Sequence, residues 1–145
     1  MKIRLVFAFV GFAISLAVPT FAQEQNAVDP EVRQQIEDAY KNFHDAYNKH
    51  DAAAVAALFT LDAVEVIEGR SEGGLSSGQE AIKKMFEIEL ASGSTVSGKI
   101  VQVYAVGSAV CAISEFTSQR HHTGSGVTIF VRDADEWKIR MQYSN

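Results

Sequence analysis

A change in hydrophobic period near Ser94 constrains the fold of this chain more than any other feature. Before it, apolar residues recur every three or four positions, which is the period of an amphipathic helix. After it, apolar and polar residues alternate, as in strands that bury one face. Short turns separate these segments, so neighbouring strands must be antiparallel. The pattern predicts an α+β fold with strands at about 96–106, 108–120, 126–133 and 136–143.

Two helices are expected at the start of the domain. Asp29 can act as N-cap and Pro30 as the first residue of a helix that runs to about Lys49. Asp51 then caps a short Ala-rich helix that ends near Phe59. The first helix presents one apolar face, formed by Ile36, Tyr40, Phe43 and Tyr47.

A strand and a third helix follow. The β-branched run 63–67 predicts a short strand, and the Gly- and Ser-rich segment 69–78 predicts a mobile loop. Ser77 and Glu80 match the S-x-x-E capping box, so we expect the third helix to open at Ser77. These elements predict three N-terminal helices packed on one face of a strongly bent, mainly antiparallel sheet.

The first 22 residues have the layout of a secretory signal peptide. Lys2 and Arg4 make a basic start, residues 5–17 form an uncharged apolar run, and small residues precede a cut after Ala22. We expect the mature protein to be periplasmic or secreted, without stable insertion in a membrane. The expected organisation is a signal peptide at 1–22, a disordered leader at 23–29 and one domain at 30–145.

Charge and histidine spacing narrow the possible partners. The chain has 18 acidic and 13 basic residues, a formal charge of -5 and no basic stripe with interleaved aromatics, which disfavours nucleic-acid binding. His44 and His50 lie about 240° apart around a helix, and His121 and His122 point to opposite faces of a strand. No histidine pair can chelate a metal locally, so we expect no metal and no cofactor. A metal site assembled from distant parts of the chain stays open.

Three segments carry a recognisable pattern: Asn48 to Val64, Gly78 to Ile82 with Phe86, and Trp137 to Ser144. Taken in order, they resemble the nuclear transport factor 2-like superfamily, in its SnoaL-like, ketosteroid-isomerase-related branch. The match covers essentially all of 31–144. The resemblance implies a cone-shaped, cystatin-like fold with the sheet wrapped around the long helix and an apolar pocket at its mouth. It also implies a homodimer formed through the outer sheet face.

The resemblance further locates the catalytic positions of ketosteroid-isomerase relatives. Those enzymes use a Tyr on the first helix as hydrogen-bond donor and an Asp on the first strand as base, and these positions fall on Phe43 and Ile67 here. The same relatives carry a second acid on a late strand, and the corresponding position in this sequence lies near Val127. Neither Phe43 nor Ile67 can carry a proton, so the pocket can be similar in shape but the chain is not that enzyme.

Glu65 is the candidate for a replacement base. In a regular register it shares a strand face with Ile67, whereas a slip or bulge would turn it outward. We expect it to be the one ionisable group in an otherwise apolar pocket, where burial would raise its pKa above the ordinary value of about 4.3. Tyr47 or His44 is the candidate donor. The expected lining is Tyr40, Phe43, Tyr47, Glu65, Ile67, Met85 and Phe86.

Polar and apolar residues on the later strands bear on assembly. Ile113 and Phe116 are three residues apart on one expected strand, so their side chains point to opposite faces of the sheet. Both faces then carry apolar residues, and an apolar outer face predicts a homodimer that covers it. The face that Glu115 occupies stays open. Arg140 and Gln142 are expected to face water or a partner subunit.

Three functions follow from these features. The first is an exported protein that binds an apolar or polycyclic small molecule, favoured by the apolar side chains at Phe43 and Ile67. The second is a cofactor-independent isomerase, dehydratase or cyclase with Glu65 as general base. The third is a non-catalytic association module. The same fold hosts all three, so fold analogy does not choose among them.

Export with cleavage after Ala22 is testable directly. Expression with the native N-terminus should give a periplasmic or secreted species without residues 1–22, because the small residues before the cut suit signal peptidase. Intact-mass measurement of the exported fraction checks this. A full-length chain retained in the cytoplasm would contradict it.

Overall fold

The computed structural model describes residues 28–69, 74–119 and 122–145. The expected signal peptide and most of the expected leader lie outside these residues. Val28 and Asp29, which we expected in the leader, already belong to the fold: Val28 packs against the core and Asp29 caps the first helix. In chain order the elements are α1 (Pro30–Asn48), α2 (Ala52–Ala57), β1 (Phe59–Ile67), β2 (Leu75–Ser77), α3 (Gln79–Leu90), β3 (Val96–Val106), β4 (Ala109–Ser118), β5 (His122–Asp133) and β6 (Glu136–Ser144).

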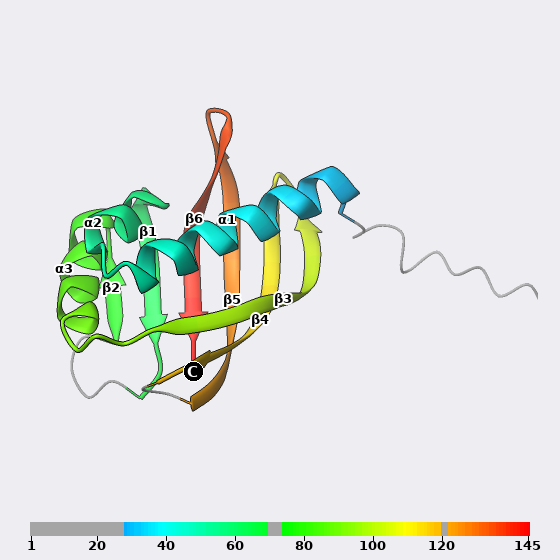
Figure 1. Ribbon diagram of the computed structural model, residues 1–145. Coiled ribbons are helices and arrows are strands. Elements are labelled where there is room, and N and C mark those ends of the chain that lie inside the picture. The colour runs from blue at the N-terminus through cyan, green and yellow to red at the C-terminus, as the bar shows by residue number, and fades with distance from the viewer. Residues whose placement is uncertain (1–27, 70–73, 120–121) are drawn as a thin grey trace, which may run out of the picture.

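The described strands form one six-stranded sheet in the order β2-β1-β6-β5-β4-β3. β3 to β6 pair antiparallel in succession, which confirms the expected four-strand meander. β1 is antiparallel to β2 but parallel to β6, so the first strand of the chain lies beside the last. Figure 1 shows α1 crossing one face of this curved sheet, with α2 and α3 beside β1 and β2. The fold is the expected α+β type, but β1 and β2 precede α3, so the helices are not one N-terminal group.

Side-chain caps begin the first two helices where the sequence predicts them. Asp29 accepts a hydrogen bond from the backbone N–H of Glu31 at 2.8 Å, and Asp51 accepts one from that of Ala54 at 2.9 Å. Each bond satisfies a backbone donor that has no partner inside the helix. Local sequence therefore sets the points at which α1 and α2 begin.

The expected start of the third helix is wrong. Ser77 ends β2, and the residue before the helix is Gly78, which has a φ of 83° and no side-chain cap. A positive φ of this size favours glycine. The segment expected as a mobile loop contains a strand, because Leu75–Ser77 pairs with β1. The free edge of β1 thus overrides the capping-box pattern, while residues 70–73 of the segment lie outside the described residues.

A bulge in β6 decides which way its second half faces. Phe130 pairs with Ile139, but the preceding Ile129 pairs with Met141, so one residue of β6 is left over. An extra residue of this kind reverses the alternation of the side chains that follow it. Gln142 consequently lies on the inner face of the sheet, and our expectation that it faces water or a partner subunit is wrong.

Aromatic rings link the helices to the sheet. Phe43 of α1, Phe59 of β1 and Phe86 of α3 are buried, and their ring centroids lie 5.8 to 6.3 Å apart. Rings at such distances and at tilted or edge-on angles attract one another beyond the gain from burial. Ile36 and Ile82, which are also fully buried, belong to the same core. This cluster joins α1, β1 and α3 at one side of the sheet.

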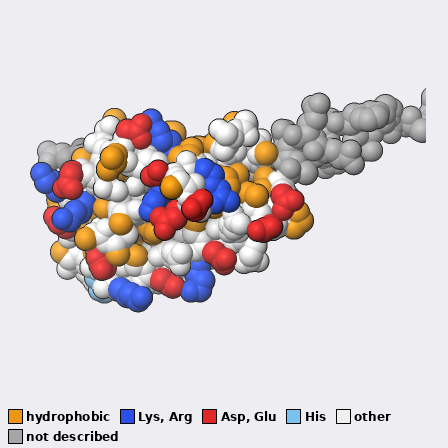
Figure 2. Space-filling model, turned by 90° about the horizontal axis from the view of Figure 1, so that it is seen from above, with side chains coloured by type: hydrophobic (Ala, Val, Ile, Leu, Met, Phe, Trp, Pro, Cys, Tyr) orange, Lys and Arg blue, Asp and Glu red, His pale blue; other side chains and the backbone are white. Residues whose placement is uncertain are grey.

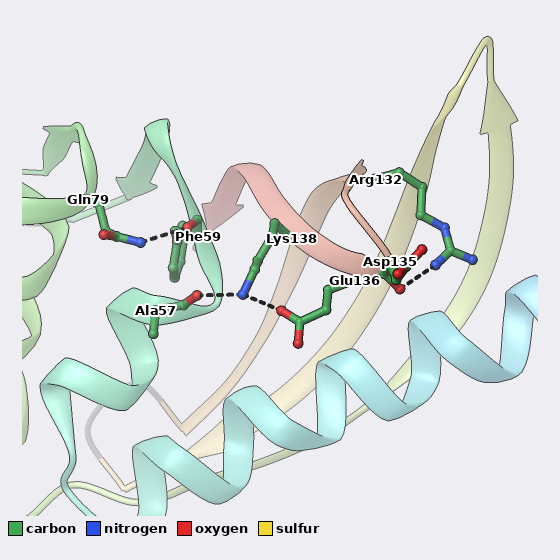
Figure 3. A network of polar contacts seen from close by, with 7 residues as sticks. All are labelled: Ala57, Phe59, Gln79, Arg132, Asp135, Glu136 and Lys138. Carbon is green, nitrogen blue, oxygen red and sulfur yellow. Dashed lines mark hydrogen bonds and ion pairs between the residues drawn. The ribbon is translucent and has the colours of Figure 1, made fainter.

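Polar contacts fasten α2 and α3 to the strands beside them (Figure 3). The Lys138 ammonium of β6 donates to the carbonyl of Ala57, at the end of α2, at 3.0 Å and pairs with Glu136 at 2.8 Å. The Gln79 side chain, in the first turn of α3, donates to the carbonyl of Phe59 at 2.9 Å. Because Lys138 belongs to the last strand, its bond ties that strand to the connection between α2 and β1. The contact supports the parallel pairing of β1 with β6.

Charged side chains are spread over the surface. On the face shown in Figure 2, acidic and basic side chains lie side by side without a continuous basic area. Some pair along a helix, such as Lys41 with Asp45 at 2.6 Å on α1. Among the helices in the part of the chain that is described, none is long and apolar enough to cross a membrane.

The ring cluster predicts the effect of a truncation. Phe86→Ala should lower the free energy of unfolding by about 3 to 5 kcal/mol, because it removes one ring and leaves a cavity. Urea denaturation followed by circular dichroism measures the change. Ile88→Ala is the matched control on the same helix: Ile88 is 73% exposed, and its loss should change the free energy by within about 0.5 kcal/mol. Equal effects of the two substitutions would contradict the role of the cluster.

Candidate functional site

A cavity of about 70 Å³ lies between the helices and the inner face of the sheet. α1 and α3 contribute aromatic side chains, and the strands contribute smaller and more polar ones. This mixture of apolar surface with a few polar groups is typical of small-molecule sites. The wall is formed by Tyr40, Phe43, His44, Tyr47, Glu65, Ile67, Phe86, Glu89, Val96, Ser114, Phe116, Ser118, Gly126, Gln142, Ser144 and Asn145.

Six of the seven residues that the sequence predicts for a pocket lie together in this wall. The exception is Met85, which is buried in the hydrophobic core and does not line the cavity. On α3, Phe86 and Glu89 are three residues apart and share the face toward the cavity. Met85 is rotated by about 100° from Phe86 around the helix, which turns it away.

Glu65 points into the cavity from β1. Its side chain is 2% exposed, and in the sheet it lies between Ser76 of β2 and Gln142 of β6. The alternation along this part of β1 is regular, because Ala63 and Glu65 are buried while Val64 between them is less so. The register therefore has no slip that would turn the carboxyl group outward.

A second carboxyl group, that of Glu89 on α3, also lines the cavity. Glu89 is 3% exposed, and its Oε1 accepts a hydrogen bond from the Tyr47 hydroxyl at 3.3 Å. Our expectation that Glu65 is the one ionisable group in the pocket is therefore wrong. A signal for Glu89 exists in the sequence, because its spacing of three from Phe86 places it on the same face of the predicted helix, beside Leu90. Both are buried, and Glu89 faces the cavity.

His44 lies on α1 where β3 approaches the helix. Burial lowers its pKa to about 4, and the carboxylate of Asp45 opposes this shift only in part. The imidazole is therefore uncharged at neutral pH. A Cβ atom added at Gly98 of β3 would lie 3.0 Å from the imidazole Cε1, so glycine at this position allows the close approach. His44 can offer a neutral ring nitrogen to the cavity but no positive charge.

Hydroxyl groups form another part of the wall. Burial raises the pKa of Tyr40, and the hydrogen bond between its hydroxyl and the Ser114 side chain opposes the shift. Tyr40 therefore stays protonated and uncharged at neutral pH. Ser114 and Ser118 are buried on β4, on the face that points toward α1. No sequence signal marks either serine, because each is one polar residue in an alternating strand.

Two positions singled out from the sequence lie away from the cavity. Val127, the position counted for a second acid, is 39% exposed and pairs with Ile113 and Tyr143 on the outer face of the sheet. Glu115 is exposed and its carboxylate lies 3.8 Å from the Lys99 ammonium. The acidic groups of the site are therefore Glu65 and Glu89, from β1 and α3.

The chemistry of the wall is that of hydrogen bonding and proton exchange. Carboxylates can accept a proton or a hydrogen bond, and the hydroxyls of serine and tyrosine can donate or accept one. Within the described residues, no group of three or more His, Cys, Asp or Glu side chains is arranged to hold a metal ion. The arrangement can orient a polar group of a ligand against an aromatic surface.

Solved structures share the fold. A domain of unknown function with a cystatin-like fold from Nostoc punctiforme has a TM-score of 0.68 and 13% identity, over 81% of this chain and 78% of that one. A nuclear transport factor 2-like protein with a cystatin-like fold from Novosphingobium aromaticivorans has a TM-score of 0.65 and 19% identity, over 79% of this chain and 80% of that one. A ketosteroid isomerase-like protein from Erwinia carotovora atroseptica has a TM-score of 0.63 and 17% identity, over 80% of this chain and 96% of that one. At these identities the likeness shows the fold alone.

The family is shown by sequence. No curated protein matches the chain. The model of the SnoaL-like domain matches residues 40–141, a range that runs from α1 into β6 and includes both Glu65 and Glu89. This range is more than half of the chain, and it agrees with the resemblance found in the motifs. The protein belongs to the SnoaL-like domain family, within the nuclear transport factor 2-like superfamily.

Proposed function

We propose that this protein binds a small, mostly apolar metabolite in the cavity, and that it works outside the cytoplasm, where its N-terminal segment would direct it. The observation that carries the proposal is the composition of the wall. Aromatic side chains of α1 and α3 share one cavity with buried carboxylates and serine hydroxyls. A few placed polar groups in an apolar wall orient a bound ligand. Membership of the SnoaL-like family also supports small-molecule binding.

The size of the cavity limits the ligand. Its volume of about 70 Å³ is roughly half that of an engineered cavity of about 150 Å³ that binds benzene. A polycyclic ligand would fit only if side chains of the wall moved apart. The ligand we propose is therefore small, or enters the cavity with one end only.

A second candidate function is proton transfer with Glu65 as general base, and the place of its carboxyl group in the wall favours it. In such a reaction Glu65 takes a proton from one atom of the ligand and returns it to another, so the ligand is isomerised without a cofactor. The Tyr47 hydroxyl donates its one hydrogen to Glu89. The neutral imidazole of His44 is therefore the better donor toward negative charge that develops on the ligand.

Nuclear magnetic resonance tests the binding proposal. Neutral apolar fragments should shift the amide resonances of wall residues such as Phe86 and Ser114, and leave those of the outer sheet face unchanged. Glu65→Gln should alter the affinity of fragments that bind, because it changes a polar group in the wall. Glu115→Gln, on the outer face, is the matched control and should leave the affinity unchanged.

Two results separate the alternatives. If the protein is an enzyme, Glu65→Gln should reduce turnover by about 10² to 10⁴-fold without unfolding the chain. If it only binds, no fragment or metabolite will be converted by the native protein. Fragments that shift only the outer face would contradict both functions.

The outer face of the sheet supports a proposal about assembly. The described helices pack on the opposite face, as the position of α1 in Figure 1 shows. Paired residues form two apolar rows across the strands, and a two-sided apolar sheet normally needs a second cover. We propose that a second copy of the chain provides it. The rows are Tyr104, Cys111, Ile129, Met141 and Val64, and Ile113, Val127, Tyr143, Val66 and Leu75.

Light scattering measures the proposed homodimer. At micromolar concentration the native protein should have about twice the mass of one chain. Val127→Lys should favour the monomer, because it places a charge within the second row. Ile88→Lys, at an exposed position on α3, is the matched control and should leave the dimer intact. A strictly monomeric native protein would contradict the proposal.

A further inference from the structure

A second hollow lies beside the cavity, between α1 and β3. It is a cleft at the surface with a volume of about 360 Å³, against about 70 Å³ for the cavity. The cleft is lined by Glu37, Tyr40, Lys41, His44, Gly98, Lys99 and Ile100. Tyr40 and His44 belong to the walls of both hollows. These two side chains therefore form a partition between the cavity and the cleft.

Tyr40 spans the distance from α1 to β4. Its side chain is buried, and its hydroxyl forms a hydrogen bond with the Ser114 side chain. The centroid of its ring lies 4.3 Å from that of the His44 imidazole. The hydrogen bond fixes the outer end of Tyr40 on the sheet, so the ring gives the imidazole a firm support on one side.

His44 closes the space between α1 and β3. A Cβ atom added at Gly98 would lie 3.0 Å from the imidazole Cε1 and 2.9 Å from the Cβ of Phe116, so the backbone of β3 comes close to the ring where it passes. On the helix, the centroid of the Phe43 ring lies 5.9 Å from that of the imidazole. His44 is only 9% exposed, although the cleft lies beside it. Its lowered pKa, about 4, reflects the same exclusion of water. The imidazole is thus a packed wall between the two hollows.

We propose that His44 limits the length of the ligand that the protein accepts. A short ligand fits in the cavity against Phe43 and Phe86, whereas a longer one meets the imidazole before it reaches the cleft. Without the imidazole the two hollows would join, and Ile100, which is partly buried against the core, would offer apolar surface to the added length. This inference deepens the proposed binding function and rests on it.

A series of linear alcohols from 1-propanol to 1-octanol tests the inference. Its members share one polar group and differ by one methylene from each to the next. Each alcohol is titrated into the native protein and followed by the amide resonances of Phe86 in the cavity and Ile100 in the cleft. Every methylene that becomes buried should tighten binding by about fourfold. In the native protein this gain should stop once the cavity is filled, and no alcohol should shift the resonance of Ile100.

Variants assign the limit to the imidazole. In His44→Ala the gain should continue for at least two more methylenes, so 1-octanol should bind on the order of tenfold more tightly than to the native protein. The long alcohols should then also shift Ile100. His44→Gln removes the ring nitrogens but keeps a side chain of similar length, and it should retain the native limit. Lys41→Ala, which enlarges the cleft without opening the partition, is the matched control and should retain it too.

The outcomes distinguish this inference from the function on which it rests. A gain that continues through 1-octanol in the native protein overturns the length limit and leaves small-molecule binding in place. This result needs no variant, so it decides the question even if His44→Ala fails to fold, and His44→Val then takes its place. The same limit in the native protein and in the truncated variant overturns the assignment to His44. If no alcohol shifts the resonances of the wall in either protein, the length limit is overturned, and the screen of neutral fragments decides the binding function separately.

Discussion

The contact among Phe43, Phe59 and Phe86 is the constraint on which the rest of the structure depends. It holds α1, β1 and α3 together, so α1 must cross the sheet from this point. Farther along the sheet, two facing inward positions of β4 and β5 are occupied by the small residues Ser114 and Gly126, although Phe116 of β4 also lines the cavity. Interiors are normally filled to high density, and small side chains opposite a helix leave space unfilled. The cavity follows from a fixed helix over a part of the sheet where small inward residues leave space below it.

Buried polar groups lie inside this space. Glu65 and Glu89 are buried acids, and burial of a carboxyl group costs free energy unless its hydrogen bonds to water are replaced. His44 is likewise buried in its neutral form, which its lowered pKa reflects. Departures from a consistent apolar core are expected at functional sites. The buried acids therefore support function at this cavity more strongly than its shape does.

The two faces of the same strands differ in chemical character. On β6, the bulge places Met141 and Tyr143 on the outer face and Gln142 and Ser144 in the cavity wall. Without the extra residue this alternation would be reversed, and polar groups would replace apolar ones on the outer face. One irregularity thus preserves both the apolar rows and the polar side of the cavity. A partly polar cavity wall and an apolar outer face can be built on one sheet because side chains on a strand alternate with a period of two.

The sequence by itself determined the starts of α1 and α2 and the four-strand meander, whereas the sheet register decided between the two directions that the sequence left open for Glu65. The helix starts and the meander depend on an N-cap, a turn or an alternation that acts over a few residues. Tertiary structure decided the strand at Leu75–Ser77 and the parallel pairing of β1 with β6, because both need an edge supplied by a distant part of the chain. It also decided that Glu89 and not Met85 faces the cavity. One residue along a helix is a rotation of about 100°, and only the packing of α3 against α2 and β1 sets which of the two side chains faces the cavity.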